Sequence, residues 1–481
     1  MEEHGSFRPA LHFSPHKGWL NDPNGLIYHD GLWHLYFQHY PHDTVWGPMH
    51  WGHAVSRDLM HWEELPIALY PAGELYRFSG SMVFDRDNTS GMARTGADGT
   101  LIPPFAAFYT SHVATGHLES QSVAFSYDGG MTFEDYPGNP IVATPVIDGV
   151  PLSDFRDPKV FKNPDTGLWN MTVAAKYYCN FYESSDLIHW NLTSTFTHGF
   201  KEITNVWACT DLIPFETCEG RKWVFFASME NKEDQPEPRT MYFVGRFENG
   251  TFTPEEKTAD PLWIDFGWDN YAGVTFNDCP LSDPVMIGWA VNPRYANQVP
   301  TGREGFRGHM TSARKLTLVR TTEGWRLSFS PLGFDMNEDG LSKDQNAVIS
   351  SPCLIHVHGG EGRLTLKNTE GEHFDVTVTK DAVTIDRSAA GEQDFQMDFG
   401  TKAYSFRTVS RLVPADAAGD AGHIGGDRAR DIDMTIILDG CLIEVYADGG
   451  LETASVNAFP KTPYSLVSAE GGLEVRVSEL K

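Results

Sequence analysis

The segment Trp19-Leu20-Asn21-Asp22-Pro23-Asn24-Gly25 places a carboxylate and an amide among aromatic side chains, a combination typical of sugar sites. Asp, Asn, Pro and Gly in succession cannot continue a helix or a regular strand ladder. We therefore expect Asp22 to lie on a rigid turn rather than within an element. A rigidly held, ionised carboxylate suits a nucleophile. Taken alone, the same residues are equally typical of a turn that only reverses the chain.

A second carboxylate stands beside a cation in Arg156-Asp157-Pro158. We expect Arg156 to keep Asp157 ionised, because a neighbouring opposite charge favours the charged form. An isolated Arg-Asp-Pro is more typical of a surface turn with a local ion pair. The apolar flanks Phe155 and Val160 favour a place in a site instead.

The elements that must position these residues are strands. Aromatic and β-branched runs alternate with Gly, Pro, Asn and Asp clusters, and amphipathic helices of more than two turns are hard to find, so we predict an all-β protein. Ser-x-Asp-Leu followed by His-Trp occurs at 56–62 and 185–190, with looser relatives at 126–133 and 242–252. Recurrence about every 60 to 70 residues fits one four-stranded propeller blade with its loops.

About five such blades fit before residue 330. The inner strands of a propeller converge on its central channel, so Asp22, Asp157 and position 208 can meet there. In the repeated turns, we expect the Asp to accept backbone N–H groups and the Trp or Phe to pack between blades. These turn residues are therefore interpreted as structural.

The pattern changes at residues 332–344, which are polar and show no strand alternation. Beyond them, short alternating strands such as 362–366, 374–378 and 432–439 predict a two-sheet antiparallel sandwich. The Ala-, Gly- and Asp-rich segment 415–430 is interpreted as a mobile surface loop. We predict three parts, namely a five-bladed β-propeller catalytic domain at 1–335, a linker at 336–345 and a β-sandwich domain at 346–481.

Charge narrows the choice of partners. The chain of 481 residues has 37 Lys and Arg against 65 Asp and Glu, a net charge of −28. Such a balance repels phosphate backbones and anionic lipids, so nucleic acid and membranes are poor partners and a small neutral saccharide is favoured. The acidic excess is also an ordinary solubility feature.

Cysteine and histidine spacing predicts no metal and no other cofactor. The six cysteines lack paired metal spacing and are too few for a disulfide framework, so we expect free thiols. The histidines at 12, 16, 39, 42, 50 and 53 do not form ligand pairs. No basic start followed by an apolar core is visible, and no run approaches about 18 apolar residues. We expect a cytoplasmic protein, or a secreted one if a leader has been removed.

Several further segments follow Trp19–Gly25 in a recognisable order, at 35–38, 45–53, 56–62, 78–81, 155–160 and 207–212. With them the chain resembles glycoside hydrolase family 32, the invertases, levanases, inulinases and related β-fructosidases. The resemblance covers essentially the whole chain. It implies a five-bladed propeller followed by a C-terminal sandwich, in agreement with the strand pattern.

The resemblance also implies roles for individual residues. Asp22 would attack the anomeric C2 of a β-linked fructofuranosyl unit, and Asp157 would bind fructose hydroxyls and stabilise the oxocarbenium-like transition state. Trp19 and Trp51 would either contact the ligand or pack beneath it. The residues expected to bind substrate are Asn21, Gln38, Trp46, Phe78, Ser79, Arg156 and Trp289.

One departure concerns the general acid. The family motif reads Trp-Glu-Cys with Glu as proton donor, whereas this chain reads Trp207-Ala208-Cys209. Asp211 has an odd offset from Ala208 and should point away from the site. Thr210 is too weak an acid, and Glu216 lies on a loop beyond Pro214. We find no substitute, and we expect turnover to collapse while binding survives, since general acid catalysis contributes about 100-fold to 10,000-fold.

Ala208 has two alternative explanations. Either it was introduced to trap an unreacted substrate, or this chain is a natural relative that binds fructosides without cleaving them. We favour the first, because every other pocket residue remains fit for catalysis. A fructosyltransferase and a non-catalytic fructoside-binding propeller remain alternatives, and a sialidase is a weaker one raised by the pattern at 126–133. Chain length, linkage, phosphorylated sucrose as substrate and oligomeric state are open.

Overall fold

The computed structural model describes residues 7–200, 203–230, 238–255, 258, 260–321, 323–334, 345–400, 404–407 and 431–480. They form two compact units, one of residues 15–263 and 271–289, the other of the described parts of 1–14, 264–270 and 290–481. Helix in these ranges is limited to η1 (Pro300–Glu304) and η3 (Asp448–Gly450), and no described helix could cross a membrane. The predicted all-β fold, a five-bladed propeller with a C-terminal β-domain, is confirmed.

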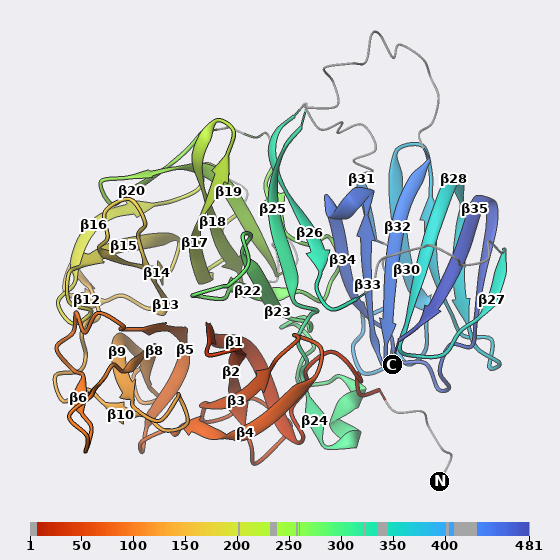
Figure 1. Ribbon diagram of the computed structural model, residues 1–481. Coiled ribbons are helices and arrows are strands. Elements are labelled where there is room, and N and C mark those ends of the chain that lie inside the picture. The colour runs from red at the N-terminus through yellow and green to blue at the C-terminus, as the bar shows by residue number, and fades with distance from the viewer. Residues whose placement is uncertain are drawn as a thin grey trace. The chain divides into compact units, whose positions relative to one another are not determined.

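The first unit contains four complete antiparallel sheets and two strands of a fifth (Figure 1). The first two sheets are β1 (Gly18–His29), β2 (Leu32–Tyr40), β3 (His50–Ser56) and β4 (Trp62–Leu69), then β5 (Leu75–Phe84), β8 (Phe105–Val113), β9 (Leu118–Ser126) and β10 (Glu134–Asp135). The third and fourth are β13 (Phe155–Lys162), β14 (Trp169–Ala175), β15 (Tyr178–Ser184) and β16 (Asn191–Phe196), then β17 (Trp207–Thr217), β18 (Gly220–Met229), β19 (Arg239–Glu248) and β20 (Thr251–Pro254). The fifth contributes β22 (Tyr271–Thr275) and β23 (Val285–Trp289).

Five short strands complete the strand content of this unit. Strand β21 (Leu262–Trp263) pairs with β19 at the edge of the fourth sheet. The other four form two isolated hairpins, β6 (Arg94–Thr95) with β7 (Leu101–Ile102) and β11 (Val146–Ile147) with β12 (Val150–Pro151).

The inner strands β1, β5, β13, β17 and β22 contact one another in turn and close a ring (Figure 1). Apolar clusters fill the space between successive sheets. One cluster contains Phe108 of β8 and Phe155 of β13, and another contains Phe181 of β15 and Trp207 of β17. Burying apolar surface between sheets is the dominant stabilising contribution in such a fold, so the blades fix the inner strands in place.

The repeated turns have the structural role that the sequence predicts. Oδ1 of Asp58 accepts the backbone N–H of Met60 and of His61, and Asp186 repeats this arrangement in the third sheet. The indole of Trp190 packs edge-on against Phe108 of the neighbouring sheet, with ring centroids 5.9 Å apart. These residues stabilise hairpins and blade contacts and take no part in the site.

Each inner strand carries a β-bulge, where two of its residues oppose one residue of the next strand. The bulged pairs are Asn21–Asp22 in β1, Phe78–Ser79 in β5, Asp157–Pro158 in β13, Cys209–Thr210 in β17 and Ala272–Gly273 in β22. The expectation that Asp22 lies on a turn outside an element is therefore wrong. Asp, Pro and Asn do interrupt the ladder, but the interruption is a bulge within a strand of 12 residues.

In the second unit, the long strands β28 (Cys353–Lys367) and β35 (Leu466–Glu479) pair with each other and are shared by two layers. The first half of β28 also pairs with β32 (Ile432–Asp439), and its second half with β29 (His373–Val378). Further strands are β24 (Phe306–Arg307), β25 (Arg314–Thr321), β26 (Gly324–Pro331), β27 (Asn346–Val348), β30 (Ala382–Ala389), β31 (Tyr404–Arg407), β33 (Leu442–Ala447) and β34 (Glu452–Asn457).

Alternating buried side chains of β28, β29, β32 and β33 form one apolar core in this unit. Beside it lies a buried ionic cluster, in which Arg314 pairs with Glu444 at 2.8 Å and His12 pairs with Asp439 at 2.8 Å. Burial opposes protonation of His12, but hydrogen bonds with Asp439 and Glu444 raise its pKa to about 9. The predicted linker lies outside the described residues except for Gln345, and the predicted loop at 415–430 lies wholly outside them.

Candidate active site

The predicted nucleophile, Asp22, meets side chains from two other inner strands. The hydroxyl of Ser79 donates a 2.7 Å hydrogen bond to Oδ2 of Asp22. The thiol Sγ of Cys209 lies 3.5 Å from the same oxygen. All three residues belong to bulged pairs, so the bulges of β1, β5 and β17 bring them together.

Asp157 joins the same group from β13. Its Oδ2 accepts the backbone N–H of Cys209 at 2.9 Å and lies 3.6 Å from Sγ of Cys209. The backbone N–H of Asp157 itself donates to Oγ1 of Thr110 at 2.9 Å. The φ of Asp157 is 63°, a left-handed value found at its bulge. Ala208 directly precedes Cys209 in the sequence. The expected meeting of Asp22 and Asp157 therefore occurs, and position 208 adjoins the cysteine that lies between them.

The expectation that Arg156 keeps Asp157 ionised is wrong. Burial raises the pKa of Asp157 to about 7, outweighing Arg156, and the carboxylates of Asp22 and Glu119 add to the rise. The guanidinium Nε of Arg156 lies 3.9 Å from Oδ2 of Asp157, so its effect is weaker than the loss of water. Burial in a low-dielectric site disfavours the charged form of a carboxyl.

Four carboxylates surround the guanidinium of Arg156. Besides Asp157, it pairs with Asp154 at 3.0 Å, with Glu119 at 3.4 Å and, through Nη2, with Oε1 of Glu230. A single positive charge therefore faces a surplus of negative charge. Glu230 was not among the candidates selected from the sequence, although it directly follows the last residue of β18.

The side chain of Asp211 does not join Asp22 and Asp157, although it lies on the same face of the sheet as Ala208. Ala208 pairs with Ser228 and Asp211 pairs with Phe226, so the bulge between them restores the same face of the sheet. The carboxylate of Asp211 accepts from Thr275 and lies 3.2 Å from Nζ of Lys159. The expectation that Asp211 faces away from Ala208 is wrong, because the bulge interrupts the regular ladder.

Aromatic side chains of β1, β22 and β23 lie next to Asp22. The indole of Trp19 donates to Oδ1 of Asn21 at 2.7 Å and packs edge-on against Trp289, with ring centroids 5.9 Å apart. Among the described residues, the buried indole Nε1 of Trp289 and the buried hydroxyl of Tyr271 have no hydrogen-bond partner. Buried polar groups are normally paired, so these two donors beside Asp22 are exceptions to that rule.

The remaining predicted substrate-binding residues lie on β2, β5 and the loop before β3. Gln38 is the single residue opposite the Asn21–Asp22 bulge, and its amide donates to the carbonyl of Arg77 at 2.8 Å. Phe78 contacts the half-exposed Trp46 at 5.9 Å between ring centroids. Their contacts with substrate remain predictions.

Trp51 is one of the two tryptophans whose position the sequence left open. It is fully buried, and its indole donates to the carbonyl of Phe78 at 3.0 Å. Trp51 therefore packs beneath the site.

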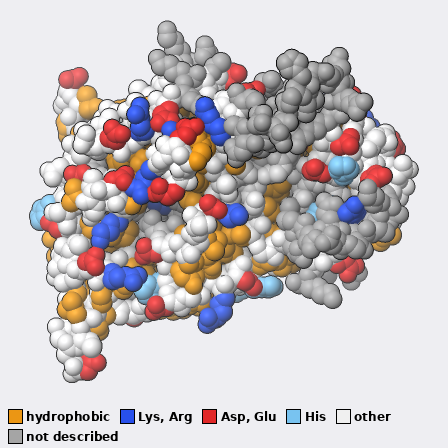
Figure 2. Space-filling view, turned by 45° about the horizontal axis from the view of Figure 1, so that its top comes forward, with side chains coloured by type: hydrophobic (Ala, Val, Ile, Leu, Met, Phe, Trp, Pro, Cys, Tyr) orange, Lys and Arg blue, Asp and Glu red, His pale blue; other side chains and the backbone are white. Residues whose placement is uncertain are grey.

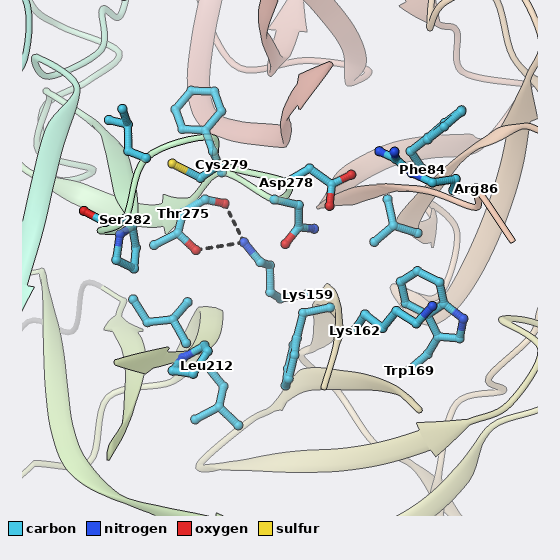
Figure 3. Close-up of a pocket in the computed structure, with 18 of the residues that line it drawn as sticks. Phe84, Arg86, Lys159, Lys162, Trp169, Leu212, Thr275, Asp278, Cys279 and Ser282 are labelled. Atoms are coloured by element: carbon cyan, nitrogen blue, oxygen red, sulfur yellow. Dashed lines mark hydrogen bonds between the residues drawn. The ribbon is translucent and has the colours of Figure 1, made fainter. Parts of the chain in front are cut away.

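Two cavities adjoin this group. A small one of about 20 Å³ is lined by Asp157, Ser79 and Cys209, and another of about 390 Å³ is lined by Arg86, Lys162, Trp169 and Asp278 among others. Lys159 and Thr275 line both, and Figure 3 shows Lys159 reaching toward Thr275 in the larger cavity. The Lys159–Asp211–Thr275 cluster therefore forms the boundary between the carboxylate site and the larger cavity.

The outer surface carries charges of both signs. Figure 2 shows acidic and basic side chains interspersed over the described part of one face, with apolar patches between them. This face presents no continuous basic area, in keeping with the net charge of −28.

Comparison with known families gives two matches that follow each other along the chain. The family described as Glycosyl hydrolases family 32 N-terminal domain matches residues 12–331. The one described as Glycosyl hydrolases family 32 C terminal matches residues 342–481. The first match lies in the predicted propeller, and the second includes the predicted C-terminal β-domain.

Curated relatives agree in sequence. The levanase of Bacillus subtilis is 33% identical over 494 residues, covering 98% of this chain and 69% of that protein. The invertase of Schizosaccharomyces pombe is 39% identical over 384 residues, covering 77% of this chain and 63% of that protein. The chain thus spans about two thirds of the length of both.

Solved structures agree in fold. The exo-inulinase of Aspergillus awamori superposes with a TM-score of 0.85 at 26% identity, covering 100% of this chain and 99% of that chain. A fructofuranosidase of Schwanniomyces occidentalis, a Glu-to-Ala variant solved with fructosylnystose, superposes with a TM-score of 0.81 at 28% identity, covering 99% and 98%. With both family domains matched and a relative 33% identical over 98% of this chain, this chain belongs to glycosyl hydrolase family 32.

Proposed function

We propose that this protein is a retaining β-fructofuranosidase that acts on terminal β-fructosyl units of sucrose and fructo-oligosaccharides. The observation that carries the proposal is the fixed position of Asp22, held by Ser79 and Cys209 in a group that also contains Asp157. In this reaction a carboxylate of Asp22 attacks the anomeric C2 and forms a fructosyl-enzyme, which water then hydrolyses.

Features of the pocket support a furanose ligand. A sugar presents hydroxyls on its rim and apolar faces, so its site needs fixed polar groups and aromatic walls. The indole of Trp289 and the phenol of Tyr271 supply aromatic surface, and each has a buried donor without a partner among the described residues. Relatives named levanase and invertase, and a fructofuranosidase structure complexed with fructosylnystose, support the same substrate class.

Asp157 has the position of a transition-state stabiliser in this proposal. In its ionised form it would face the positive charge that develops on the furanose ring, and electrostatic stabilisation of that kind is usually a large contribution to catalysis. Its raised pKa makes this contribution pH-dependent, so we expect kcat/KM to rise as pH increases through about 7.

Ala208 makes this chain an impaired version of the enzyme. A methyl group cannot protonate the departing glucosyl oxygen of sucrose, and such protonation typically contributes about 100-fold to 10,000-fold. Loss of a carboxylate near Asp22 and Asp157 also removes like-charge repulsion, so substrate affinity should be retained. Without a proton donor at position 208, the chain as written should turn sucrose over more slowly than a version with glutamate there.

Ala208→Glu is the variant that tests the proposal. We expect it to hydrolyse sucrose, kestose or levan faster than the chain as written. Calorimetry measures the binding of these sugars to the chain as written. If the variant hydrolyses none of the three substrates, the proposal is contradicted and a binding protein is favoured. Product analysis at high sucrose concentration distinguishes hydrolysis from transfer to a second sugar.

A further inference from the structure

The pairing of β17 with β18 places a carboxyl close to Ala208. Ala208 lies opposite Ser228, and the backbone N–H of Glu230 donates to the carbonyl of Val206 at 2.8 Å, two residue pairs further along the ladder. Glu230 is therefore opposite Val206. Alternate residues of a strand and their cross-strand partners share one face, so Glu230 and Ala208 are diagonal neighbours on the same face. Cα atoms in such a pair are about 7 to 8 Å apart, within reach of a long side chain.

Contacts of Glu230 direct its carboxyl toward the site. Its Oε1 accepts from Nη2 of Arg156, whose Nε lies 3.9 Å from Oδ2 of Asp157. Burial raises the pKa of the Tyr271 phenol, and the charges of Glu230 and Asp22 raise it further, so both carboxylates lie within electrostatic range of that phenol. The side chain of Glu230 is 38% exposed, which leaves it open to exchange protons with solvent.

The surroundings of Glu230 also suit a proton donor. Partial loss of hydration raises the pKa of Glu230 against the pull of Arg156, and the carboxylates of Asp154 and Glu119 add to the rise. When Glu230 is protonated, Arg156 keeps its ion pairs with Asp154 and Glu119. A proton on Glu230 therefore leaves no unpaired charge behind, and it reduces the surplus of negative charge around one guanidinium.

We propose that Glu230 is the general acid and base of this chain, in place of the carboxyl absent from position 208. The inference rests on the proposed function. The carboxylate of Asp22 forms a bond to C2 while the C2–O glycosidic bond breaks. The electron pair of the broken bond goes to the leaving oxygen, which takes the proton of Glu230. The Glu230 carboxylate then takes a proton from water as the water oxygen attacks C2. This step releases fructose, restores the Asp22 carboxylate and returns the proton to Glu230.

The test compares two substrates that differ in their need for an acid. Sucrose loses an unactivated alkoxide and needs a proton, whereas β-fructofuranosyl fluoride loses fluoride and does not. We expect Glu230→Gln to lower kcat on sucrose about 100-fold, the low end of the range for general acid catalysis. Its first turnover of the fluoride should be unchanged. Steady-state turnover of the fluoride should then be slow and accelerated by added azide, which needs no base to attack C2.

Two further variants separate a chemical from a structural role. Asp154→Asn removes another carboxylate from the same guanidinium, so it should affect both substrates in equal proportion and show no azide acceleration. Ala208→Glu combined with Glu230→Gln should regain sucrose turnover, because a glutamate at 208 makes Glu230 dispensable. Glu230→Asp, which retracts the carboxyl by one methylene, should show the same selective loss. Melting temperatures confirm that each variant folds.

Four results would overturn the inference. Equal losses on both substrates in Glu230→Gln, or no recovery in the double variant, would assign Glu230 a structural role. No sucrose turnover by the chain as written, together with turnover by Ala208→Glu, would mean that this chain has no acid at all and would leave the proposed function standing. No turnover by Ala208→Glu on any fructoside would contradict the proposed function itself.

Discussion

The thiol Sγ of Cys209 lies 3.5 Å from Oδ2 of Asp22, although the two residues are 187 positions apart in the sequence. The same thiol lies 3.6 Å from Oδ2 of Asp157, so it stands between the two carboxylates. Its backbone has a φ of 45°, which the bulge in β17 imposes. A neutral thiol can donate to a carboxylate, whereas a thiolate at this place would repel both.

We therefore predict that Cys209 resists alkylation in the folded protein. Burial raises the pKa of its thiol, and the neighbouring charges of Asp157 and Asp22 raise it further, so the reactive thiolate is not formed. Treatment with iodoacetamide at about pH 8, followed by peptide mass spectrometry, measures this reactivity. Cys218 is exposed and is the internal control that should be labelled. Labelling of Cys209 at the rate of Cys218 would contradict the arrangement.

Ser79→Ala should lower kcat in the Ala208→Glu background. The hydroxyl of Ser79 donates to Oδ2 of Asp22 at 2.7 Å and orients the nucleophile. A hydrogen bond to a charged group contributes about 1.5 to 3 kcal/mol, equivalent to about 10-fold to 100-fold in rate. Initial rates on sucrose give the measurement. Ser111→Ala is the matched control, because Ser111 is buried in the adjacent β8 and bonds to Ser122 instead.

The sequence predicted which residues meet, but not the backbone that brings them together. Asp22 and Asp157 could be selected because their residue types and neighbours indicate a site. Their placement on bulges could not be predicted, because a bulge depends on the pairing of two strands and not on one segment. The turn expected at Asp22 came from correct local preferences that tertiary pairing overruled.

Glu230 shows the same limit more clearly. The hairpin of β17 and β18 pairs Asp211 with Phe226, and a regular ladder continued from there would pair Glu230 with Trp207, on the opposite face from Ala208. The bulge at Cys209–Thr210 shifts the register by one residue. A one-residue shift moves every later side chain to the other face, and so brings Glu230 to the side of Ala208.

Asp157→Asn should stabilise the fold above neutral pH. The carboxyl titrates near 3.8 when unfolded and near 7 when folded, so the folded protein binds its proton more tightly. As pH rises between these values, the unfolded chain ionises first and stability is lost. Asparagine does not ionise, so the variant does not lose this stability as pH rises. Its melting temperature should therefore exceed that of the parent at about pH 8 and match it at about pH 4.

Asp186→Asn is a control of opposite sign. Burial raises the pKa of Asp186, but its hydrogen bonds, chiefly those with His189, outweigh burial and lower the pKa to about 2. Its ionised form therefore stabilises the fold at neutral pH, and the variant should melt at a lower temperature than the parent at about pH 8. Equal responses of the two variants to pH would show that Asp157 is not held in the state described.

The five bulges give the site an architecture that can be altered one blade at a time. Each inner strand delivers two adjacent residues through its own local backbone distortion, and the ring is closed by apolar packing elsewhere. Exchanging alanine for glutamate at position 208 should therefore add a chemical group without altering the bulges of the other four inner strands. Such modularity lets evolution, or an experimenter, separate recognition of a sugar from its cleavage without rebuilding the scaffold.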